Sequence, residues 1–272
     1  MKEKATLYRA EQLDELLVFK AQYDRFQFTN HVHDEFALGI MESGVQKFSC
    51  RGNEHFASEG SLITVNPDEV HNGQSANDGT FRYRVIYVPF DLMQDVGTSA
   101  VAYRPNHYFG SPVTVDPQLA SCLAQVLFLL EQKDCELLEV QTLFYSVLTA
   151  LLLKHGTESD QLQKNQLMSQ PVDIACTFIS DMARESISLD DIAKVAGLSR
   201  FHFLRVFTRV TGMSPHAYLT QRRLELAKAS IRKNVSLADA ALEAGFADQS
   251  HLSRRFKSAF GITVGQYKKA VS

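Results

Sequence analysis

The sequence of 272 residues predicts an α+β protein with a β-rich N-terminal half, a pair of following helices and an all-α C-terminal domain. Three observations predict this fold class. Residues 25–90 hold short β-branched and aromatic segments separated by turn residues, which is typical of a sandwich or small barrel. From Pro117 the apolar spacing changes to that of helices. The last hundred residues contain an internal repeat.

The expected strands of the N-terminal half alternate with Gly, Asn, Asp and Pro turns, and we place them at residues 36–42, 45–50, 61–65 and 81–88. Two helices are expected at residues 117–132 and 135–154. Their apolar stripes are Leu119, Leu123, Val126 and Leu130 in the first, and Leu137, Phe144, Val147 and Leu151 in the second. The polar stretch from His155 to Gln170 has no period and is expected to be a linker that Pro171 closes.

The composition excludes several classes of protein. With 45% hydrophobic and 22% charged residues the chain can bury cores and is not expected to be disordered. Its longest apolar run, Val147–Leu153, is shorter than the roughly 18 residues of a membrane span, and the charged N-terminus has no secretory apolar region. Four scattered cysteines without a CxxC pair favour reduced thiols over zinc ligands or disulfides. We therefore expect a cytoplasmic protein.

Charge is distributed unevenly along the chain. Residues 171–272 carry 15 Lys and Arg against 9 Asp and Glu, whereas the first 170 residues carry 13 against 22. A basic third joined to an acidic remainder favours a polyanionic partner for the C-terminal part alone.

The repeat relates Ser188–Leu198 to Ser236–Phe246, and six of the eleven positions are identical. After one inserted residue the match resumes and pairs Arg205 with Arg254. The sequence predicts a capping box at the start of each copy, Ser188 with Asp191 and Ser236 with Asp239. A glycine, Gly197 or Gly245, stands where the first helix of each copy must end.

A second helix is expected in each copy, at residues 200–210 and 248–260. The predicted buried stripes are Phe203, Phe207 and Val210, and Leu252, Phe256 and Phe260. Helical hairpins also build solenoids and bundles, but the opposite faces here carry side chains suited to guanine, phosphate and thymine methyl groups. These are Arg200, Phe201, Leu204, Arg205 and Arg209, and Ser250, His251, Arg254, Lys257 and Ser258. The pattern predicts two DNA-binding helix-turn-helix units.

A long helix is expected to join the two units. Pro215 after Ser214 is typical of a helix start, and the apolar spacing continues to about Arg232. Such a helix is roughly 26 Å long, which suits two recognition helices near one turn, about 34 Å, of DNA apart.

Residues 175–270 resemble the C-terminal domain of the AraC/XylS family of bacterial transcription regulators. The matching pieces are Ser188-Leu189, Ala193, Ala196-Gly197-Leu198-Ser199, Phe207, Gly212-Met213-Ser214-Pro215, Tyr218, Ala241, Ala244-Gly245-Phe246, Ser250–Lys257 and Phe260-Gly261. Val264 departs from the family, where many members place a proline that starts the last helix. The resemblance implies DNA contacts at Arg200, Phe201, Leu204, Arg205, Ser250, His251 and Arg254. Several relatives carry a polar residue at Leu204, so we expect a thymine methyl contact there.

The N-terminal half resembles the cupin barrel that serves as the sensor of many such regulators, through His31-Val-His33, Gly44, Gly60, Asn66-Pro67 and His71. Metal-binding cupins place a Glu four or five residues after the second histidine, where this chain has Ala37 and Leu38, so no metal or other cofactor is expected. A rudimentary metal site of His31, His33 and His71, or a merely structural role for them, stays open. We favour a small polar effector held by His31, His33, Glu35, His71, Arg82, Tyr83, Arg84 and Tyr87.

One question about this barrel cannot be answered by the period of its strands. On residues 81–88, Phe81, Tyr83, Val85 and Tyr87 share one face, and Arg82 and Arg84 share the other. Either face could point into the barrel, and Glu42 is a further candidate beside them.

The chain is thus expected to comprise an arm and effector-binding barrel at 1–112, a helical dimerisation segment at 113–156, a linker at 157–170 and the DNA-binding domain at 171–272. The apolar helices either pack on the barrel or pair two subunits, and we favour a homodimer. The expected function is an effector-controlled regulator, more often an activator that contacts RNA polymerase than a repressor, and not an enzyme. The alternatives are a metal-dependent cupin enzyme with an accessory helical domain, and a regulator whose barrel is purely structural.

Overall fold

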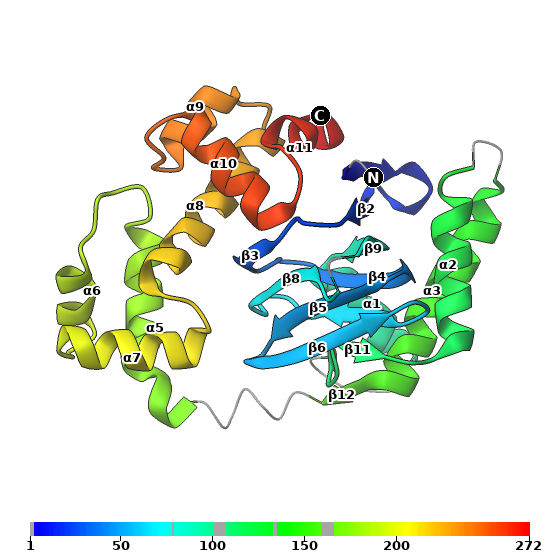
Figure 1. Ribbon diagram of the computed structural model, residues 1–272, viewed down its shortest axis with the longest axis horizontal. Coiled ribbons are helices and arrows are strands. Elements are labelled where there is room, and N and C mark those ends of the chain that lie inside the picture. The colour runs from blue at the N-terminus through cyan, green and yellow to red at the C-terminus, as the bar shows by residue number, and fades with distance from the viewer. Residues whose placement is uncertain (1–2, 78, 101–106, 133–134, 159–165) are drawn as a thin grey trace. The chain divides into compact units, whose positions relative to one another are not determined.

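The computed structural model describes residues 3–77, 79–100, 107–132, 135–158 and 166–272. It divides into two compact units (Figure 1). The first comprises Met1–Phe28 and Val32–Ser159, and the second comprises Asp160–Ser272 together with Thr29–His31. The first is rich in strands and the second in helices, so the predicted α+β fold class is confirmed.

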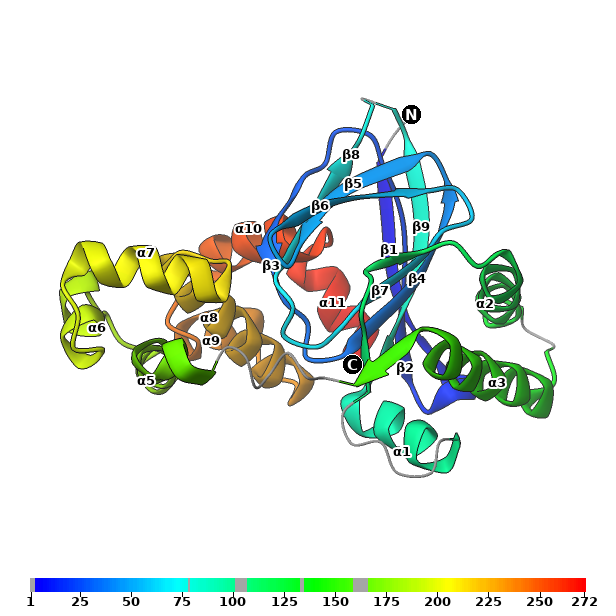
Figure 2. The ribbon, with the colours of Figure 1, turned by 90° about the horizontal axis from the view of Figure 1, so that it is seen from below.

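The strands of the N-terminal half form two sheets, whose faces are seen in Figure 2. The larger has the order β1-β2-β9-β4-β7-β11, the smaller β3-β8-β5-β6, and β10 pairs with β12 in a separate ladder. The strands are β1 (Lys4–Ala10), β2 (Leu16–Tyr23), β3 (Phe28–His31), β4 (Phe36–Ser43), β5 (Val45–Cys50), β6 (Asn53–Ser58), β7 (Leu62–Val65), β8 (His71–Ser75), β9 (Phe81–Val88), β10 (His107–Phe109), β11 (Val113–Thr114) and β12 (Gly156–Glu158). A 3-10 turn (η1, Glu11–Leu13) joins β1 to β2.

The two faces of the larger sheet have different neighbours. Leu38 of β4 and Ile86 of β9 lie directly opposite each other and belong to a core that also contains buried residues of α2 (Pro117–Leu129) and α3 (Leu137–His155). Gly39 lies opposite Val85 on the other face, where a methyl group at Gly39 would stand only 2.8 Å from Val85. Alternation along the strands therefore separates a helix-covered face from a face that Figure 2 shows turned towards the smaller sheet.

Helices cover the larger sheet because their apolar stripes need a partner. Pro117 starts α2, and the Asp116 carboxylate caps it by accepting a hydrogen bond from Leu119 N at 3.0 Å. The predicted α2 stripe is buried in the barrel core, as are Phe144, Val147 and Leu151 of α3, whereas Leu137 is exposed. These stripes thus pack on the barrel. The sequence alone left open whether they pack there or pair two subunits. A further helix, α1 (Phe90–Ala100), follows β9.

Helix α3 is long and apolar enough to span a membrane by length and composition, and α2 is shorter. A core helix passes the same test, and a buried stripe of α3 lies in the barrel core. We therefore assign α3 to that core.

The second unit consists of helices. They are α5 (Gln166–Asp181), α6 (Leu189–Val195), α7 (Arg200–Thr211), α8 (Pro215–Arg232), α9 (Leu237–Glu243), α10 (Gln249–Phe260) and α11 (Val264–Val271). Ten buried residues of α5–α8, among them Phe203, Phe207 and Leu219, form the core of the first helix-turn-helix unit. In the second, Leu252 and Phe256 are buried as predicted, whereas Phe260, the third member of the predicted stripe, is only half-buried.

The structure adds to or differs from the sequence-based expectations in several further places. Residues 4–23 form β1 and β2 at one edge of the larger sheet, where an arm was expected. Helix α5 begins within the expected linker and contains Pro171, whose ring nitrogen cannot donate to the helical ladder; residues 159–165 of that linker lie outside the described residues. Val210, expected in the buried stripe with Phe203 and Phe207, is 38% exposed and lies in the last turn of α7. Val264 starts α11 without a proline, since Thr263 and Gln266 form a capping box.

Candidate nucleic-acid interface and effector site

The first helix-turn-helix unit is built as its capping pattern predicts. The Ser188 hydroxyl accepts a hydrogen bond from Asp191 N at 3.2 Å, and the Asp191 carboxylate accepts one from Ser188 N at 2.9 Å. Gly197 then takes a φ of +67°, which ends α6 and lets the chain turn into α7. These local bonds fix where the recognition helix begins.

The second helix-turn-helix unit repeats much of this construction, although of its predicted capping box only the bond to the Ser236 hydroxyl is formed. Ser236 caps α9 by accepting from Asp239 N at 3.1 Å, and Gly245 adopts a φ of +82°. The Asp248 carboxylate accepts from His251 N at 2.7 Å and caps α10. The predicted repeat is therefore one of structure as well as of sequence.

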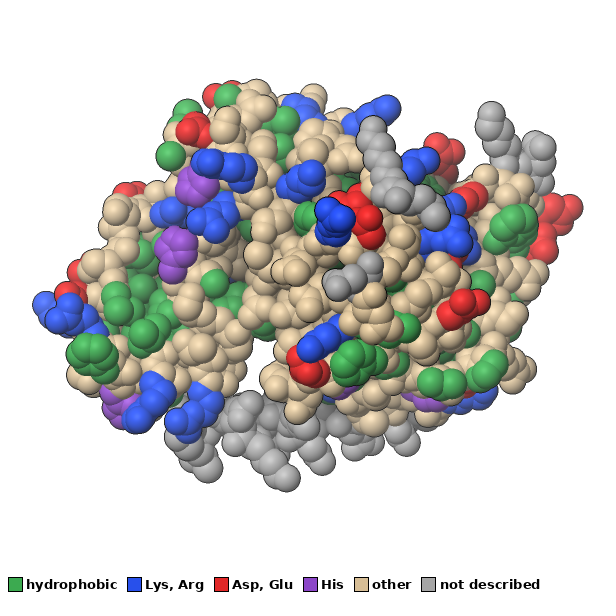
Figure 3. Space-filling model, viewed as in Figure 1, with side chains coloured by type: hydrophobic (Ala, Val, Ile, Leu, Met, Phe, Trp, Pro, Cys, Tyr) green, Lys and Arg blue, Asp and Glu red, His purple; other side chains and the backbone are tan. Residues whose placement is uncertain are grey.

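On the face opposite its buried stripe, α7 turns both polar and apolar side chains to solvent, whereas α10 turns polar ones. Phe201 is 86% exposed and Leu204 is 39% exposed on α7, and Arg200, Arg205 and Arg209 are exposed beside them. On α10, Ser250, Arg254 and Lys257 are exposed and His251 and Ser258 are partly so. Figure 3 shows hydrophobic and basic side chains adjoining over α6 and α7. The residues predicted to contact DNA thus lie together on the accessible faces of these two helices.

Two of these side chains already have partners. Arg200 pairs with Asp190 at 3.0 Å, but both are more than half exposed, so the pair is weak and open to exchange with a phosphate. The Arg255 Nε donates to His251 Nε2 at 3.5 Å. Burial and the neighbouring Arg255 and Arg254 lower the pKa of His251, which favours a neutral ring whose other nitrogen can donate to a base.

In the first unit, the inner face of β9 is aromatic. Tyr83 stacks on Phe81 with ring centroids 5.8 Å apart and meets Phe19 of β2 at the same distance. Ile86 and Val88 on the other face belong to the helix-covered core. The face with Phe81, Tyr83, Val85 and Tyr87 is therefore the one away from the helices, which the sequence could not decide.

Three of the predicted effector residues meet on this side, with His33 between His71 and Tyr87. The His33 ring lies 5.1 Å from that of His71 and 5.0 Å from that of Tyr87. His71 Nδ1 lies 2.8 Å from the Glu69 carbonyl oxygen, which assigns the ring proton to Nδ1 and leaves Nε2 as an acceptor. Burial lowers the pKa of His71 and raises that of Tyr87, which the Glu35 carboxylate also raises. His71 therefore offers a neutral acceptor nitrogen, and the Tyr87 hydroxyl keeps its proton.

Two of the other predicted effector residues, Arg84 and Arg82, are not brought to this group. Arg84 faces the helices, where its Nε lies 2.5 Å from Glu42 and Nη1 3.4 Å from Glu131. Arg82 is exposed and donates to the Ser43 hydroxyl at 3.1 Å. His31, at the end of β3, is buried with Nδ1 2.8 Å from the Thr29 carbonyl oxygen.

A network that the sequence did not predict adjoins His71. The Glu69 carboxylate accepts hydrogen bonds from Arg51 and from the Tyr108 hydroxyl, and the Arg51 guanidinium lies 4.4 Å from the Tyr108 ring centroid. Asn66 donates to Glu69 at 3.0 Å and exchanges two bonds with the backbone of Phe109. The network ties the segment before β8 to β10. Its bonds from Arg51 and Tyr108 to Glu69 and from Asn66 to Phe109 join residues 18 to 43 positions apart, so no local pattern predicts the network.

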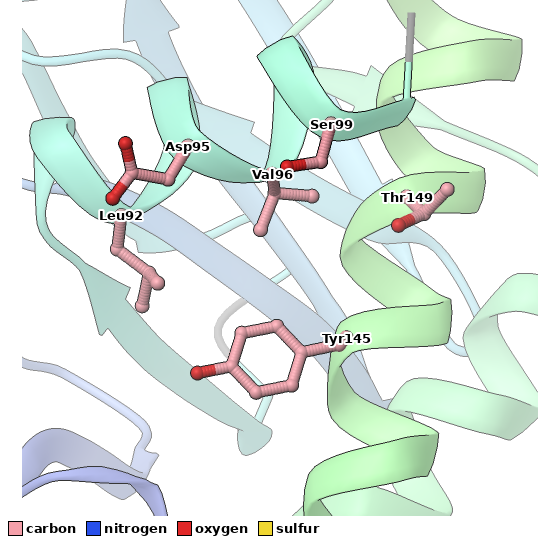
Figure 4. Close-up of a pocket in the computed structure, with 6 residues that line it drawn as sticks. All are labelled: Leu92, Asp95, Val96, Ser99, Tyr145 and Thr149. Carbon is pink, nitrogen blue, oxygen red and sulfur yellow. The ribbon is translucent and has the colours of Figure 1, made fainter.

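A groove of about 550 Å³ lies between α1 and α3 (Figure 4). Tyr145 of α3 extends towards α1, below Leu92 and Val96. The remaining lining residues are Asp95, Ser99 and Thr149. The groove borders the helix-covered core, to which its lining residue Val96 belongs, and no residue predicted for the effector lines it.

Comparisons with known proteins agree with this division of the chain. A family model described as the AraC-like ligand binding domain matches residues 15–148, and one described as a helix-turn-helix domain matches residues 192–270. The transcriptional regulator YbfI of Bacillus subtilis is 31% identical over 83% of this chain and 82% of its own length. The probable transcriptional regulator LumQ of Photobacterium leiognathi is 26% identical over 98% of both chains.

Among solved structures, ToxT of Vibrio cholerae has a TM-score of 0.53 with 14% identity, covering 99% of this chain and 98% of its own. Another ToxT structure, with a bound unsaturated fatty acid, has a TM-score of 0.54 with 15% identity, covering 94% of this chain and 96% of that one. These likenesses show a shared fold.

A ligand-binding barrel domain followed by two helix-turn-helix units defines a ligand-responsive, DNA-binding transcriptional regulator. The chain belongs to the AraC family of such regulators.

Proposed function

We propose that the effector of this regulator binds at the side of the barrel where His33, His71 and Tyr87 meet, with Glu35 beside them. The observation that supports this is the pair of buried imidazoles with ring centroids 5.1 Å apart, one of them 5.0 Å from the ring of Tyr87, away from the helix-covered face. Buried polar groups that face one another in an aromatic surround suit a small polar molecule. His31 and Tyr83 remain proposed members of this site, and Arg82 and Arg84, which face elsewhere, are its weakest members.

The experiment is a thermal-shift screen of sugars, aromatic compounds and amino acids against the full chain. A ligand that binds only the folded protein raises the melting temperature by mass action. The shift should be lost in His71→Asn and in Tyr87→Phe. It should persist in Glu54→Ala, a change at an exposed position of β6 that belongs to no proposed site. An undiminished shift in both site variants would contradict the proposed site, and no shift with any compound would favour a purely structural barrel.

We propose that DNA is contacted by Arg200, Phe201, Leu204 and Arg205 of α7 and by Ser250, His251 and Arg254 of α10. Their support is joint exposure on the accessible faces of two helices built in the same way. Arginine can bind guanine or phosphate, and Phe201 and Leu204 can contact thymine methyl groups.

We also propose that two copies pair through the outward face of α3. Leu138 is 75% exposed, and Tyr145 and Leu153 lie on the same side of the helix at helical spacing. Leu138→Glu should shift a dimer to monomer in sedimentation velocity, whereas Phe56→Glu, an equally non-conservative change at an exposed site on β6, should not. A protein that is already monomeric at micromolar concentration would contradict this.

The chain is proposed to act in the cytoplasm as an activator that contacts RNA polymerase, and not as an enzyme. Its relatives are transcriptional regulators, which supports the non-enzymatic part. Stoichiometric metal in the purified protein, lost in His31→Ala/His71→Ala, would instead favour the metal-dependent enzyme.

A further inference from the structure

The two helix-turn-helix units meet at a joint that lies outside both recognition helices. We define the joint as the turn at residues 182–185 after α5, Arg223 of α8 and Gly245 between α9 and α10. All three parts lie in the second unit of the chain. The turn belongs to the first helix-turn-helix unit through Ala183, which is buried in its core, and Gly245 belongs to the second.

Arg223 holds the first side of the joint. Its Nε donates to the Ala183 carbonyl oxygen at 2.7 Å, and its Nη2 donates to the Glu185 carbonyl oxygen at 2.8 Å. Carbonyls at the end of a helix lack partners within the helix, and a guanidinium can satisfy two of them in one fixed geometry. Arg223 therefore attaches α8 to the turn at a defined angle.

Gly245 forms the second side of the joint. A methyl group there would stand 3.0 Å from both the Ala183 carbonyl oxygen and the Cα of Arg184. Only a residue without a side chain allows the backbone of the α9–α10 turn to approach the turn after α5 this closely. The equivalent glycine of the first unit, Gly197, has the same left-handed backbone, but a methyl group on it would meet no described atom within 4 Å.

Helix α8 is also attached to the second helix-turn-helix unit. Arg232 donates to the Tyr267 hydroxyl of α11 at 2.9 Å, and the Ser230 hydroxyl donates to Glu243 of α9 at 2.8 Å. The same helix contributes Leu219 to the core of the first helix-turn-helix unit. If the two helix-turn-helix units moved relative to each other, α8 would have to bend and the joint would have to open at the same time.

We propose that this joint fixes the separation and angle of the two recognition helices, and so sets how many base pairs between the two half-sites the chain accepts. The inference rests on the DNA-binding function. Arg223 and Gly245 act as positioning residues that touch no base. One inserted base pair moves a half-site by about 3.4 Å and rotates it by about 34°. A rigid pair of helices cannot follow that change without losing contacts.

The experiment uses the full chain and duplexes that the wild type selects from a randomised pool. The spacer between the two half-sites is then changed by one base pair in each direction. The wild type should lose affinity about tenfold per step, as for a mismatched position. Arg223→Ala and Gly245→Ala should each lose affinity by about threefold or less per spacer step. Their base preference within each half-site should be unchanged. Gly197→Ala, which has the same backbone strain in open space, should retain the wild-type tenfold loss.

Circular dichroism and thermal melting establish that each variant is folded. If Gly245→Ala does not fold, Arg223→Ala alone tests the proposal. Arg223→Lys can keep one of the two hydrogen bonds, so its loss of affinity per spacer step should lie between those of Arg223→Ala and the wild type. A folded Arg223→Ala protein with the wild-type spacer dependence would overturn the proposal. Failure of the wild type to select any duplex would instead contradict DNA binding itself, so the two failures are distinguishable.

Discussion

Arg205 and Arg254 stand at the same position, the sixth residue, of α7 and α10, and both are exposed. In each helix an inward Phe two residues later, Phe207 or Phe256, is buried and fixes which face turns outward. The two guanidinium groups are therefore presented by equivalent scaffolds 49 residues apart in the chain. This equivalence supports two reading helices of one kind.

Arg205→Ala and Arg254→Ala are each expected to weaken operator binding by about 1–3 kcal/mol and to relax the preference at one base pair. The reason is loss of a bidentate contact to a base edge. Fluorescence anisotropy with a panel of singly substituted duplexes measures both effects. Lys194→Ala removes the same charge from exposed α6 and should leave every base preference unchanged. Wild-type affinity in either arginine variant would refute the assignment.

Leu204→Ala is expected to reduce the preference for thymine at one operator position. Leu204 is partly exposed beside Phe201, so its methyl groups can meet a thymine methyl in the major groove. The comparison is between duplexes with thymine and with uracil, which lacks the methyl group, at each position. The wild type should discriminate at one position where the variant does not. An identical base preference in both proteins would reject the contact.

Stability is expected to fall as the pH drops below about 6.5 because of His71. Burial lowers the pKa of His71 in the folded state, so below the unfolded value of about 6.5 the unfolded chain binds a proton that the folded chain does not. The loss grows until the folded pKa is reached. Melting temperatures of the wild type and His71→Asn at pH 7.5 and 5.5 test this. The variant should show the smaller drop, and equal drops would contradict it.

Asp116→Ala is expected to destabilise the first unit by about 1 kcal/mol through loss of the α2 cap. The hydrogen bond from Leu119 N, followed by His155, lowers the pKa of Asp116 to about 2. The stabilisation is thus present above the unfolded pKa of 3.8 and is lost as the pH falls towards 2. Urea unfolding at neutral pH should place Asp116→Asn, which can still accept the bond, close to the wild type. Equal losses in both variants would exclude the cap as the cause.

Local signals predicted much of the fold. Ser188, Pro215 and Gly245 mark helix ends by chemistry that acts within a few residues, and the helices begin or end beside them. The run at 81–88 has the strand period, and β9 matches it. The apolar period of α2 predicted a buried stripe but not its partner, because a stripe does not specify what covers it.

Long-range chemistry could not be predicted in this way. Arg84 was grouped with the effector residues, and only the sheet order places it beneath Glu131 of the segment after α2. Glu69, Arg51 and Tyr108 come from separate turns and strands. Gly197 and Gly245 look alike in the repeat, and only packing distinguishes the open one from the one in the joint.

The central claim is that both recognition helices contact one DNA duplex. The most direct measurement is the equilibrium affinity of the full chain for a selected duplex as a function of salt. Log affinity should fall linearly with log salt concentration, since phosphate contacts release counterions. Log affinity should fall less steeply for Arg205→Ala/Arg254→Ala. In a footprinting experiment, the wild type alone should protect two neighbouring major-groove segments of the duplex. Salt-independent association, or the same slope and footprint in the double variant, would contradict the account.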